Sequence, residues 1–296
     1  MTSEVGPSGR GVEHHNHTIA ALAPTLSALF GVETPMVSQA SPLPDIVREA
    51  RTALQDEPLH RCLVYAPDAV GLHLLQPMGH LFEEIRAIAP TEVHLRSMIP
   101  SKTPVCFASM FTGALPEVHG IRRPERPVLR CDTLFDALLR AGRRVAIVAV
   151  AGSSIDLIFR ERAMDYFSED YDPEVTEATL SLLELDHHDL IVAYHQEYDD
   201  ALHETTPFSP RALRAAERHV AAFRDLAAMA GKVWRRHHHV VVFTPDHGAC
   251  IDPVTGRGTH GGDSPEEMDV AHLWGFRRGQ RAGKGVSGDA EDQGSI

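Results

Sequence analysis

The chain carries the segment Val240-Val241-Val242-Phe243-Thr244-Pro245-Asp246-His247-Gly248, and this stretch decides its predicted fold. The apolar run predicts a buried strand, and the proline and glycine that follow predict a loop at the strand's carboxyl end. Asp246 and His247 therefore lie together where an open α/β sheet places its ligand chemistry. Both residue types bind Zn²⁺ or Mn²⁺. Taken alone, the segment also fits a turn with a helix-capping Asp and an incidental His.

The rest of the chain alternates between apolar runs and amphipathic segments in the same way. Besides residues 240–244, strands are predicted at residues 62–66, 93–97, 144–150, 189–194 and 272–276. Helices are predicted at residues 74–89, 107–113, 133–141, 173–185 and 210–234. Mostly unbroken apolar strands indicate a parallel sheet buried on both faces, and their alternation with helices indicates βαβ units. The predicted fold class is therefore α/β: a three-layer, doubly wound, mostly parallel sheet with helices on both faces.

Composition and charge limit the partners. Among 296 residues, 41 are acidic and 28 are basic, which gives a net charge of −13. This charge argues against nucleic acid as a partner, and none is expected, because phosphate binding needs a basic face. A small phosphorylated substrate remains compatible, since bound metal ions would reverse the local field. No apolar stretch approaches the ~20 residues of a membrane span. Residues 1–10 have no apolar core of the kind a signal peptide needs, so no signal peptide is expected.

The four cysteines are far apart in the sequence and form no Cys-x-x-Cys pair. They are predicted to be small buried residues in a reducing compartment, and the expected location is the cytoplasm. The oligomeric state is left open.

The domain organisation is predicted from the polar ends of the chain. Residues 1–17 and 279–296 are expected to be disordered tails. Residues 18–278 are expected to form a single α/β catalytic domain, in which residues 18–55 are a helical N-terminal extension with helices at 19–30 and 44–55. A histidine triplet, His237-His238-His239, enters the strand at 240–244. Metal binding by this triplet is disfavoured, because neighbouring residues of a strand face opposite sides.

Further candidate ligands follow other strands. Asp68 ends the first strand, where the alternative is that it caps the next helix. Asp199 and His203 are four residues apart, so they share one face of a helical turn and can bind one ion. Asp200 competes with Asp199, but at a spacing of three from His203. His260 precedes two glycines that allow a close approach of the backbone.

The candidate nucleophile lies in Pro100-Ser101-Lys102-Thr103, between the strand at 93–97 and the helix at 107–113. A hydroxyl at this place faces the strand ends and the positive pole of a helix, which favours anions. The alternative is that Thr103 or Ser101 only caps the helix.

These motifs, with Phe111-Thr112-Gly113 and Pro116-Glu117-Val118-His119-Gly120-Ile121, resemble the alkaline-phosphatase superfamily and within it the type I phosphodiesterase/nucleotide pyrophosphatase branch, over residues 63–276. The resemblance implies an alkaline-phosphatase-like fold, Thr103 as the nucleophile and two divalent ions, with zinc favoured over manganese. It implies one ion held by Asp199, His203 and His260. It implies a second held by Asp68, Asp246 and His247, with the oxygen of Thr103 alongside.

One departure from the branch concerns the asparagine that relatives often carry shortly after the nucleophile to hold a phosphoryl oxygen. Here Pro104, Val105 and Cys106 follow Thr103. Stabilisation of the oxyanion is then expected from a metal ion, from backbone N–H groups or from a side chain such as Lys102.

The predicted function is a two-metal hydrolase of phosphoric esters, acting on a small phosphodiester or pyrophosphate-like substrate through a phosphothreonine intermediate. A phosphomonoesterase or a phosphonate hydrolase on the same site is the alternative among enzymes. From another class, a metal-binding or scaffold protein that has lost catalysis is disfavoured by the presence of Thr103.

Overall fold

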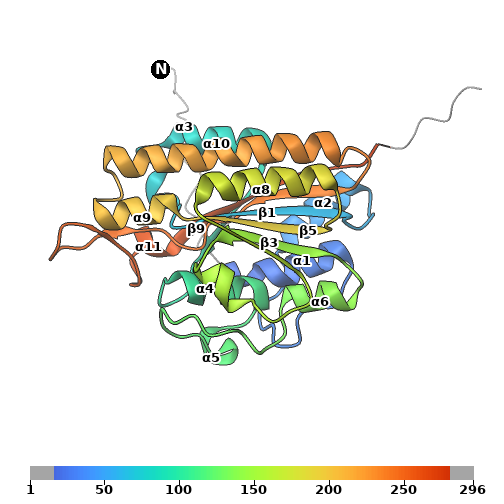
Figure 1. The fold of residues 1–296 in the computed structure, drawn as a ribbon, viewed down its shortest axis with the longest axis horizontal. Coiled ribbons are helices and arrows are strands. Elements are labelled where there is room, and N and C mark those ends of the chain that lie inside the picture. Colours follow the sequence, from blue (N-terminus) through green and yellow to red (C-terminus); the bar gives the residue numbers. More distant parts are fainter. Residues whose placement is uncertain (1–16, 281–296) are drawn as a thin grey trace, which may run out of the picture.

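The computed structural model describes residues 17–280 and is built around a seven-stranded sheet (Figure 1). The strands lie in the order β2-β9-β6-β1-β5-β3-β4. Their bounds are β1 Arg61–Pro67, β2 Thr91–Arg96, β3 Val145–Val150, β4 Asp165–Glu169, β5 Leu190–His195, β6 His239–Phe243 and β9 Asp269–Arg277. A separate two-stranded hairpin pairs β7 (Cys250–Ile251) with β8 (Gly258–Thr259).

Five adjacent strands, β6, β1, β5, β3 and β4, run parallel, and β9 is antiparallel to both of its neighbours, β6 and β2. The prediction of a mostly parallel sheet is therefore confirmed. Two strands differ from the prediction. β4 was not predicted, because its alternating, partly exposed residues at the sheet edge lack an apolar run. β9 is longer than predicted, because the strand already begins at Asp269 and includes Val270 and Ala271 before His272.

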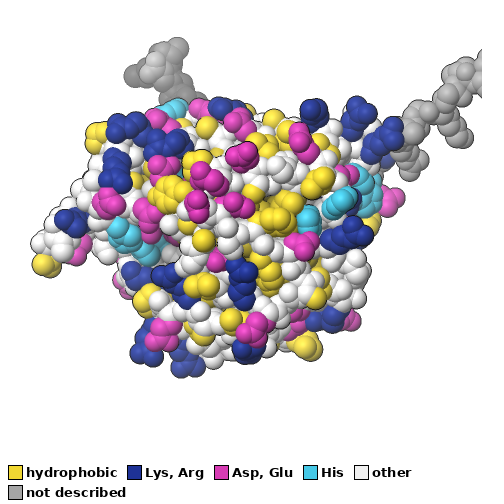
Figure 2. Space-filling model, viewed as in Figure 1, with side chains coloured by type: hydrophobic (Ala, Val, Ile, Leu, Met, Phe, Trp, Pro, Cys, Tyr) yellow, Lys and Arg dark blue, Asp and Glu magenta, His cyan; other side chains and the backbone are white. Residues whose placement is uncertain are grey.

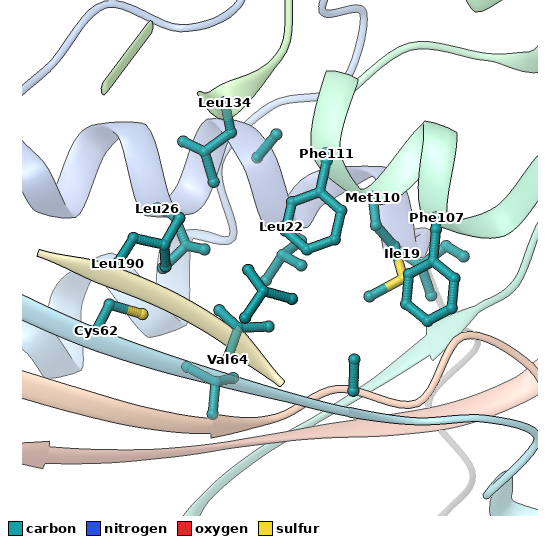
Figure 3. Packing of buried hydrophobic residues seen from close by; sticks show 14 of the residues in the cluster. Ile19, Leu22, Leu26, Cys62, Val64, Phe107, Met110, Phe111, Leu134 and Leu190 are labelled. Atoms are coloured by element: carbon teal, nitrogen blue, oxygen red, sulfur yellow. The ribbon is translucent and has the colours of Figure 1, made fainter. Parts of the chain in front are cut away.

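Helices cover both faces of the sheet (Figure 1). One face carries α3 (Gly79–Ile88), α8 (Asp172–Leu185) and α10 (Pro210–Val233), whose apolar residues form one hydrophobic core with the sheet. The other face carries α1 (Leu22–Phe30), α2 (Pro44–Leu54), α4 (Thr103–Thr112), α6 (Leu134–Arg140) and α7 (Ser154–Ile158). Figure 3 shows part of this second core, where side chains of α1 and α4 meet those of β1 and β5. The predicted three layers are thus present.

Two helix starts differ from the prediction by four residues or more, one of them beside the candidate site. α4 begins at Thr103 itself rather than at residue 107. The helix predicted from residue 74 begins only at Gly79, after a 3-10 turn at Leu72–Leu74. Pro77 accounts for the later start, since a proline disfavours helical geometry in the residue before it.

The predicted extension at residues 18–55 packs tightly on the sheet. Ile19, Leu22 and Leu26 are fully buried, and α1 packs against α4 and α6. The extension therefore supports the helix that carries Thr103. Its assignment to a single catalytic domain stays a prediction, and the predicted tails lie outside the described residues apart from His17, Gly279 and Gln280.

The cysteine prediction is only half right. Cys62 and Cys106 are buried, but Cys131 and Cys250 are partly exposed, because they lie in a loop and in the β7–β8 hairpin. No helix within residues 17–280 combines the length and apolar character needed to cross a membrane.

Candidate metal centre and nucleophile

The candidate residues come from loops at the carboxyl ends of neighbouring strands. Asp68 follows β1, Asp246 and His247 follow β6, and α9 (Glu197–Glu204), which follows β5, carries Asp199 and His203. Because β6, β1 and β5 are adjacent in the sheet, these loops meet at one edge. His260 reaches the same place from the hairpin, and Thr103 from the first turn of α4.

The first group consists of Asp199, His203 and His260. Asp199 Oδ1 lies 3.4 Å from His203 Nε2 and 3.3 Å from His260 Nε2. The two Nε2 atoms lie 3.0 Å apart. The competing Asp200 is engaged elsewhere, because its carboxylate accepts hydrogen bonds from Tyr171 and Gln196. The geometry therefore selects Asp199 over Asp200.

The second group consists of Asp68, Asp246 and His247, all of them buried. His247 Nε2 lies 3.4 Å from Asp68 Oδ1 and 3.3 Å from Asp246 Oδ2. The hydroxyl of Thr103 lies 3.3 Å from Asp68 Oδ2 and 3.4 Å from His247 Nε2. The structure thus places Thr103 beside the second group, as the sequence predicts.

The hydrogen-bond partners of the three imidazoles indicate that a cation fits here. In each, Nδ1 faces a backbone carbonyl: Gly258 O for His203, Ser101 O for His260 and Gly248 O for His247. A carbonyl only accepts, so the proton of the neutral ring lies on Nδ1 and Nε2 presents a lone pair. These lone pairs face carboxylate oxygens and, between His203 and His260, each other. Such an arrangement is repulsive unless a positive charge lies between the atoms.

The carboxylates give the same indication. Asp68 Oδ1, Asp199 Oδ1 and Asp246 Oδ2 are buried and have no hydrogen-bond donor among the described residues. Burial, with the charges of Asp246 and Asp199, raises the pKa of Asp68 well above its ordinary value, and burial likewise raises the pKa of Asp246. Burial lowers the pKa of His247. Divalent cations would reverse these effects, so the residues present fit a pair of metal ions.

Neighbouring residues that sequence reasoning missed hold the ligands in place. The Tyr194 hydroxyl donates a short hydrogen bond to Asp68 Oδ2. Ser97 Oγ donates to the backbone oxygen of Asp246 at 2.7 Å, and His272 Nε2 lies 3.0 Å from Pro245 O. These residues sit in strands or at strand ends that also form the core, so the sequence pattern offers no signal that separates them from packing residues.

The helix-capping alternatives do not describe the structure. Lys102 is the N-cap residue of α4, and no side chain caps it. Ser101 instead holds the loop of His260, accepting from Gly261 N and donating to Gly262 O. Lys102 Nζ donates to the backbone oxygen of His260. Its predicted role at the oxyanion stays a prediction.

Two glycines in the motifs are required by the path of the backbone. A Cβ atom on Gly248 would lie 2.0 Å from Glu266 O, so the backbone after His247 passes too close to α11 (Pro265–Met268) for any side chain. Gly261 has a φ of +124°, which L residues rarely adopt. Both glycines therefore allow the sharp loop paths that bring His247 and His260 to the centre.

A third buried group, Asp172, His195 and His219, has the residue types of a metal site but has its hydrogen bonds satisfied. Asp172 accepts from Gln196 N at 2.9 Å and from Glu197 N at 3.0 Å. The two imidazoles share the Tyr65 hydroxyl. Gln196, the N-cap residue of α9, makes no side-chain cap, so Asp172 caps this helix from outside. The group therefore has a structural role and positions α9.

The histidines at 237–239 do not belong to any group of potential ligands found among residues 17–280.

The mostly parallel sheet with helices on both faces is an alkaline-phosphatase-like fold. The chain belongs to the type I phosphodiesterase / nucleotide pyrophosphatase family, whose model matches residues 63–250. The resemblance inferred from the motifs is thereby confirmed.

Solved structures share the fold. A phosphonoacetate hydrolase from Sinorhizobium meliloti 1021, in complex with phosphonoformate, is 21% identical with a TM-score of 0.50; the match covers 64% of this chain and 57% of that chain. An inactive form of murine ectonucleotide pyrophosphatase / phosphodiesterase 5, in complex with AMP, is 18% identical with a TM-score of 0.51 and the same coverage, 64% and 57%. The chain thus spans less than two thirds of the length of either neighbour. No curated protein matches it.

Proposed function

We propose that this protein is a metal-dependent hydrolase of phosphoric esters that acts on a small phosphodiester or pyrophosphate-like substrate. The observation that carries the proposal is the position of Thr103. Its hydroxyl lies 3.3 Å from Asp68 and 3.4 Å from His247, beside ligand lone pairs that face one another. Membership of the family supports the reaction class. The bound AMP and phosphonoformate of the structural neighbours support a small phosphorylated ligand.

We propose two divalent ions, with zinc favoured over manganese. Asp199, His203 and His260 would hold one. Asp68, Asp246 and His247 would hold the other, with the Thr103 oxygen alongside. When bound, such ions stabilise a deprotonated hydroxyl and a leaving oxygen, which a free threonine cannot do at neutral pH.

In the proposed reaction, Thr103 Oγ1 forms a bond to phosphorus and the bond from phosphorus to the leaving oxygen breaks. A water molecule then hydrolyses the phosphothreonine. Asp68 Oδ2 accepts the hydrogen bond that orients the hydroxyl. Thr103 is also the first residue of the ten-residue helix α4, whose free N–H groups favour a phosphoryl anion at this end.

Elemental analysis combined with activity profiling tests the proposal. Protein purified without chelator should contain close to two transition-metal ions per chain. It should hydrolyse nitrophenyl phosphate esters, with bis(p-nitrophenyl) phosphate distinguishing a diesterase from a monoesterase. Dialysis against a chelator should abolish turnover, and zinc or manganese should restore it.

A protein without metal that takes up none on titration would contradict the whole proposal. Metal uptake without turnover on any mono-, di- or phosphonate ester would favour the metal-binding scaffold instead. Variants separate the two groups: His260→Ala should weaken the first ion, and Asp246→Ala should empty the second.

A further inference from the structure

A cavity of about 230 Å³ lies directly beside Thr103 and extends beyond the metal groups. It is lined by Asp68, Thr103, Arg126, Ala151, Gly152, Ser153, Ser154, Tyr194, Gln196, Asp199 and Asp200. The cavity therefore extends from the candidate nucleophile to the loop that follows β3. This loop contributes no residue to the proposed metal site.

The order of the strands sets the direction of this cavity. Asp68 follows β1, whereas Gly152 follows β3, and β5 lies between these two strands. Neighbouring strands are about 4.8 Å apart, so the β3 end of the cavity lies about two strand spacings from the β1 end. A ligand whose phosphoryl group is at Thr103 would thus extend its remaining atoms toward Gly152.

Arg126 is the single Lys or Arg of the lining. Arg126 is exposed, and its Nη1 donates to Gly152 O, which places the guanidinium at the β3 end of the cavity. Within residues 17–280, no carboxylate pairs with Arg126. Other arginines of the surrounding loops do pair with carboxylates, as Arg130 does with Glu161 and Arg160 with Asp156. The charge of Arg126 is therefore available to a ligand in the cavity.

The lining also limits the chemical class of the ligand. The aromatic side chain in it is Tyr194, which is 3% exposed, packs edge-on against Phe107 and donates its hydroxyl to Asp68. It offers no open face on which a nucleobase could stack. The remaining lining is small, polar or acidic. Of its carboxylates, Asp68 and Asp199 are candidate metal ligands and Asp200 accepts from Tyr171 and Gln196, so the cavity suits a compact, charged ligand that binds beside metal ions.

We infer that Arg126 binds a second anionic group of the substrate, a carboxylate or a phosphate, while the reacting phosphoryl group lies at Thr103. The inference rests on the proposed function and names its substrate class: small molecules with two anionic groups. A guanidinium suits this role because its planar set of N–H donors matches both carboxylate and phosphate oxygens.

Calorimetric titration of the metal-loaded protein with matched ligand pairs tests the inference without turnover. 2-Phosphoglycolate and ethyl phosphate differ by a carboxylate in place of a methyl group. Pyrophosphate and inorganic phosphate differ by the second phosphoryl group, and excess metal is kept in the buffer. The wild-type protein should prefer the doubly anionic member of at least one pair by about 10- to 100-fold in Kd. The pair that shows the preference identifies the second group as carboxylate or phosphate.

Variants then assign the preference to its residue. Arg126→Ala should bring the ratio of the two Kd values to within about 3-fold of unity, and Arg126→Lys should keep part of it. Arg123→Ala is the matched control, because Arg123 is exposed, pairs with Glu125 and does not line the cavity. Its ratio should equal that of the wild type. Equal melting temperatures show that all variants are folded.

Three results would overturn the inference: no preference in the wild type, a preference that survives in Arg126→Ala, or an equal loss of affinity for both members of a pair in that variant. The last would place Arg126 on the reacting phosphoryl group. Nitrophenyl ester turnover, measured on the same wild-type preparation, reports separately on the proposed function. Its absence together with a preference that depends on Arg126 would contradict hydrolysis and leave the binding role standing.

Discussion

The two ends of the central sheet use the same residue types for opposite purposes. Figure 2 shows histidine side chains beside α9, at the carboxyl ends of the strands, and again on the opposite side of the molecule, beyond the end of α10. At the amino ends, Asp186 pairs with Arg61 at 2.8 Å and with His237 at 3.2 Å. Asp189 accepts from Arg61 and from Arg144 N, both at 2.8 Å. Each of these carboxylate oxygens has a donor.

At the carboxyl ends, by contrast, Asp68, Asp199 and Asp246 each have one buried oxygen without a donor among residues 17–280. Buried polar atoms are almost always paired, so an unpaired set indicates an absent charge. The comparison teaches that the number of His and Asp residues does not identify a metal site. What identifies it is a set of buried acceptor atoms that face one another and have no donor among the described residues.

The largest expected effect comes from Thr103→Ala, which removes the proposed nucleophile and none of the His and Asp ligands. Turnover should fall by roughly three orders of magnitude or more, because a covalent route is lost while the electrostatics remain. Metal content should stay at the wild-type value. Steady-state kinetics and elemental analysis on one preparation measure both quantities.

Thr103→Ser serves as the control for this change, since it keeps the hydroxyl and loses only the methyl that restricts χ1. It should retain part of the activity. If Thr103→Ala keeps a substantial fraction of wild-type turnover, water attacks the substrate directly and the covalent role is wrong.

A smaller effect is expected from Asp172→Ala, which removes both acceptors at the start of α9. This helix carries Asp199 and His203, so affinity for the first ion should fall about 10- to 100-fold, as for other residues that orient metal ligands. The second ion should be unaffected. Metal titration of chelator-treated protein measures the two affinities.

Asp172→Asn keeps one carbonyl acceptor and should recover part of the loss. If Asp172→Ala weakens both ions equally, the group does not act through α9 but supports the fold as a whole.

Much of this arrangement follows from the sequence, for a physical reason. Apolar runs such as Val240-Val241-Val242-Phe243 report burial on both faces, and that pattern places the following Asp246 and His247 at the carboxyl edge. The spacing of Asp199 and His203 reports a shared helix face, and α9 provides it. Elements whose residues show a hydrophobic run or a helical spacing could therefore be predicted from the local sequence.

Other features could not be predicted, because they depend on contacts between distant segments. Asp172 caps a helix that begins more than twenty residues later, and no local pattern joins Asp172 to Gln196. Arg126 lies in a loop without a motif, and its hydrogen bond to Gly152 O joins two segments that are 26 residues apart in the sequence. The edge strand β4 lacks the apolar run that burial on both faces would produce.

The next effect in size concerns the pH dependence of stability and is expected at His119, a buried histidine away from the metal groups. Its Nδ1 accepts from Ile121 N, so the proton of the neutral ring lies on Nε2, facing Ser109 Oγ at 3.0 Å. Burial lowers the pKa of His119 to about 4, from 6.5 in the unfolded chain. Between these values the unfolded state binds a proton that the folded state does not. The contribution of neutral His119 to the free energy of unfolding is therefore fully present above pH 6.5 and is lost as the pH falls toward 4.

Replacing His119 tests the direction of this pH dependence. His119→Asn should reduce the slope of the unfolding free energy against pH by up to about 1.4 kcal/mol per pH unit between these values. Denaturant unfolding in chelator, for variant and wild type across the range, measures the slope without interference from metal. An unchanged slope would show that His119 is already charged in the folded protein.

The smallest effect is expected at the amino ends of the strands, with His237→Ala. The His237 side chain is 30% exposed and pairs with an Asp186 that keeps Arg61 as its second partner. Exposed pairs of this kind contribute little, so the free energy of unfolding should change by less than about 1 kcal/mol. Metal content should not change, because the carboxylate oxygens of Asp186 and Asp189 at this end each have a donor. Denaturant unfolding and elemental analysis give the two values. Loss of a bound ion from His237→Ala would show that histidines at this end also bind metal, and unpaired buried acceptors would then no longer separate the two ends of the sheet.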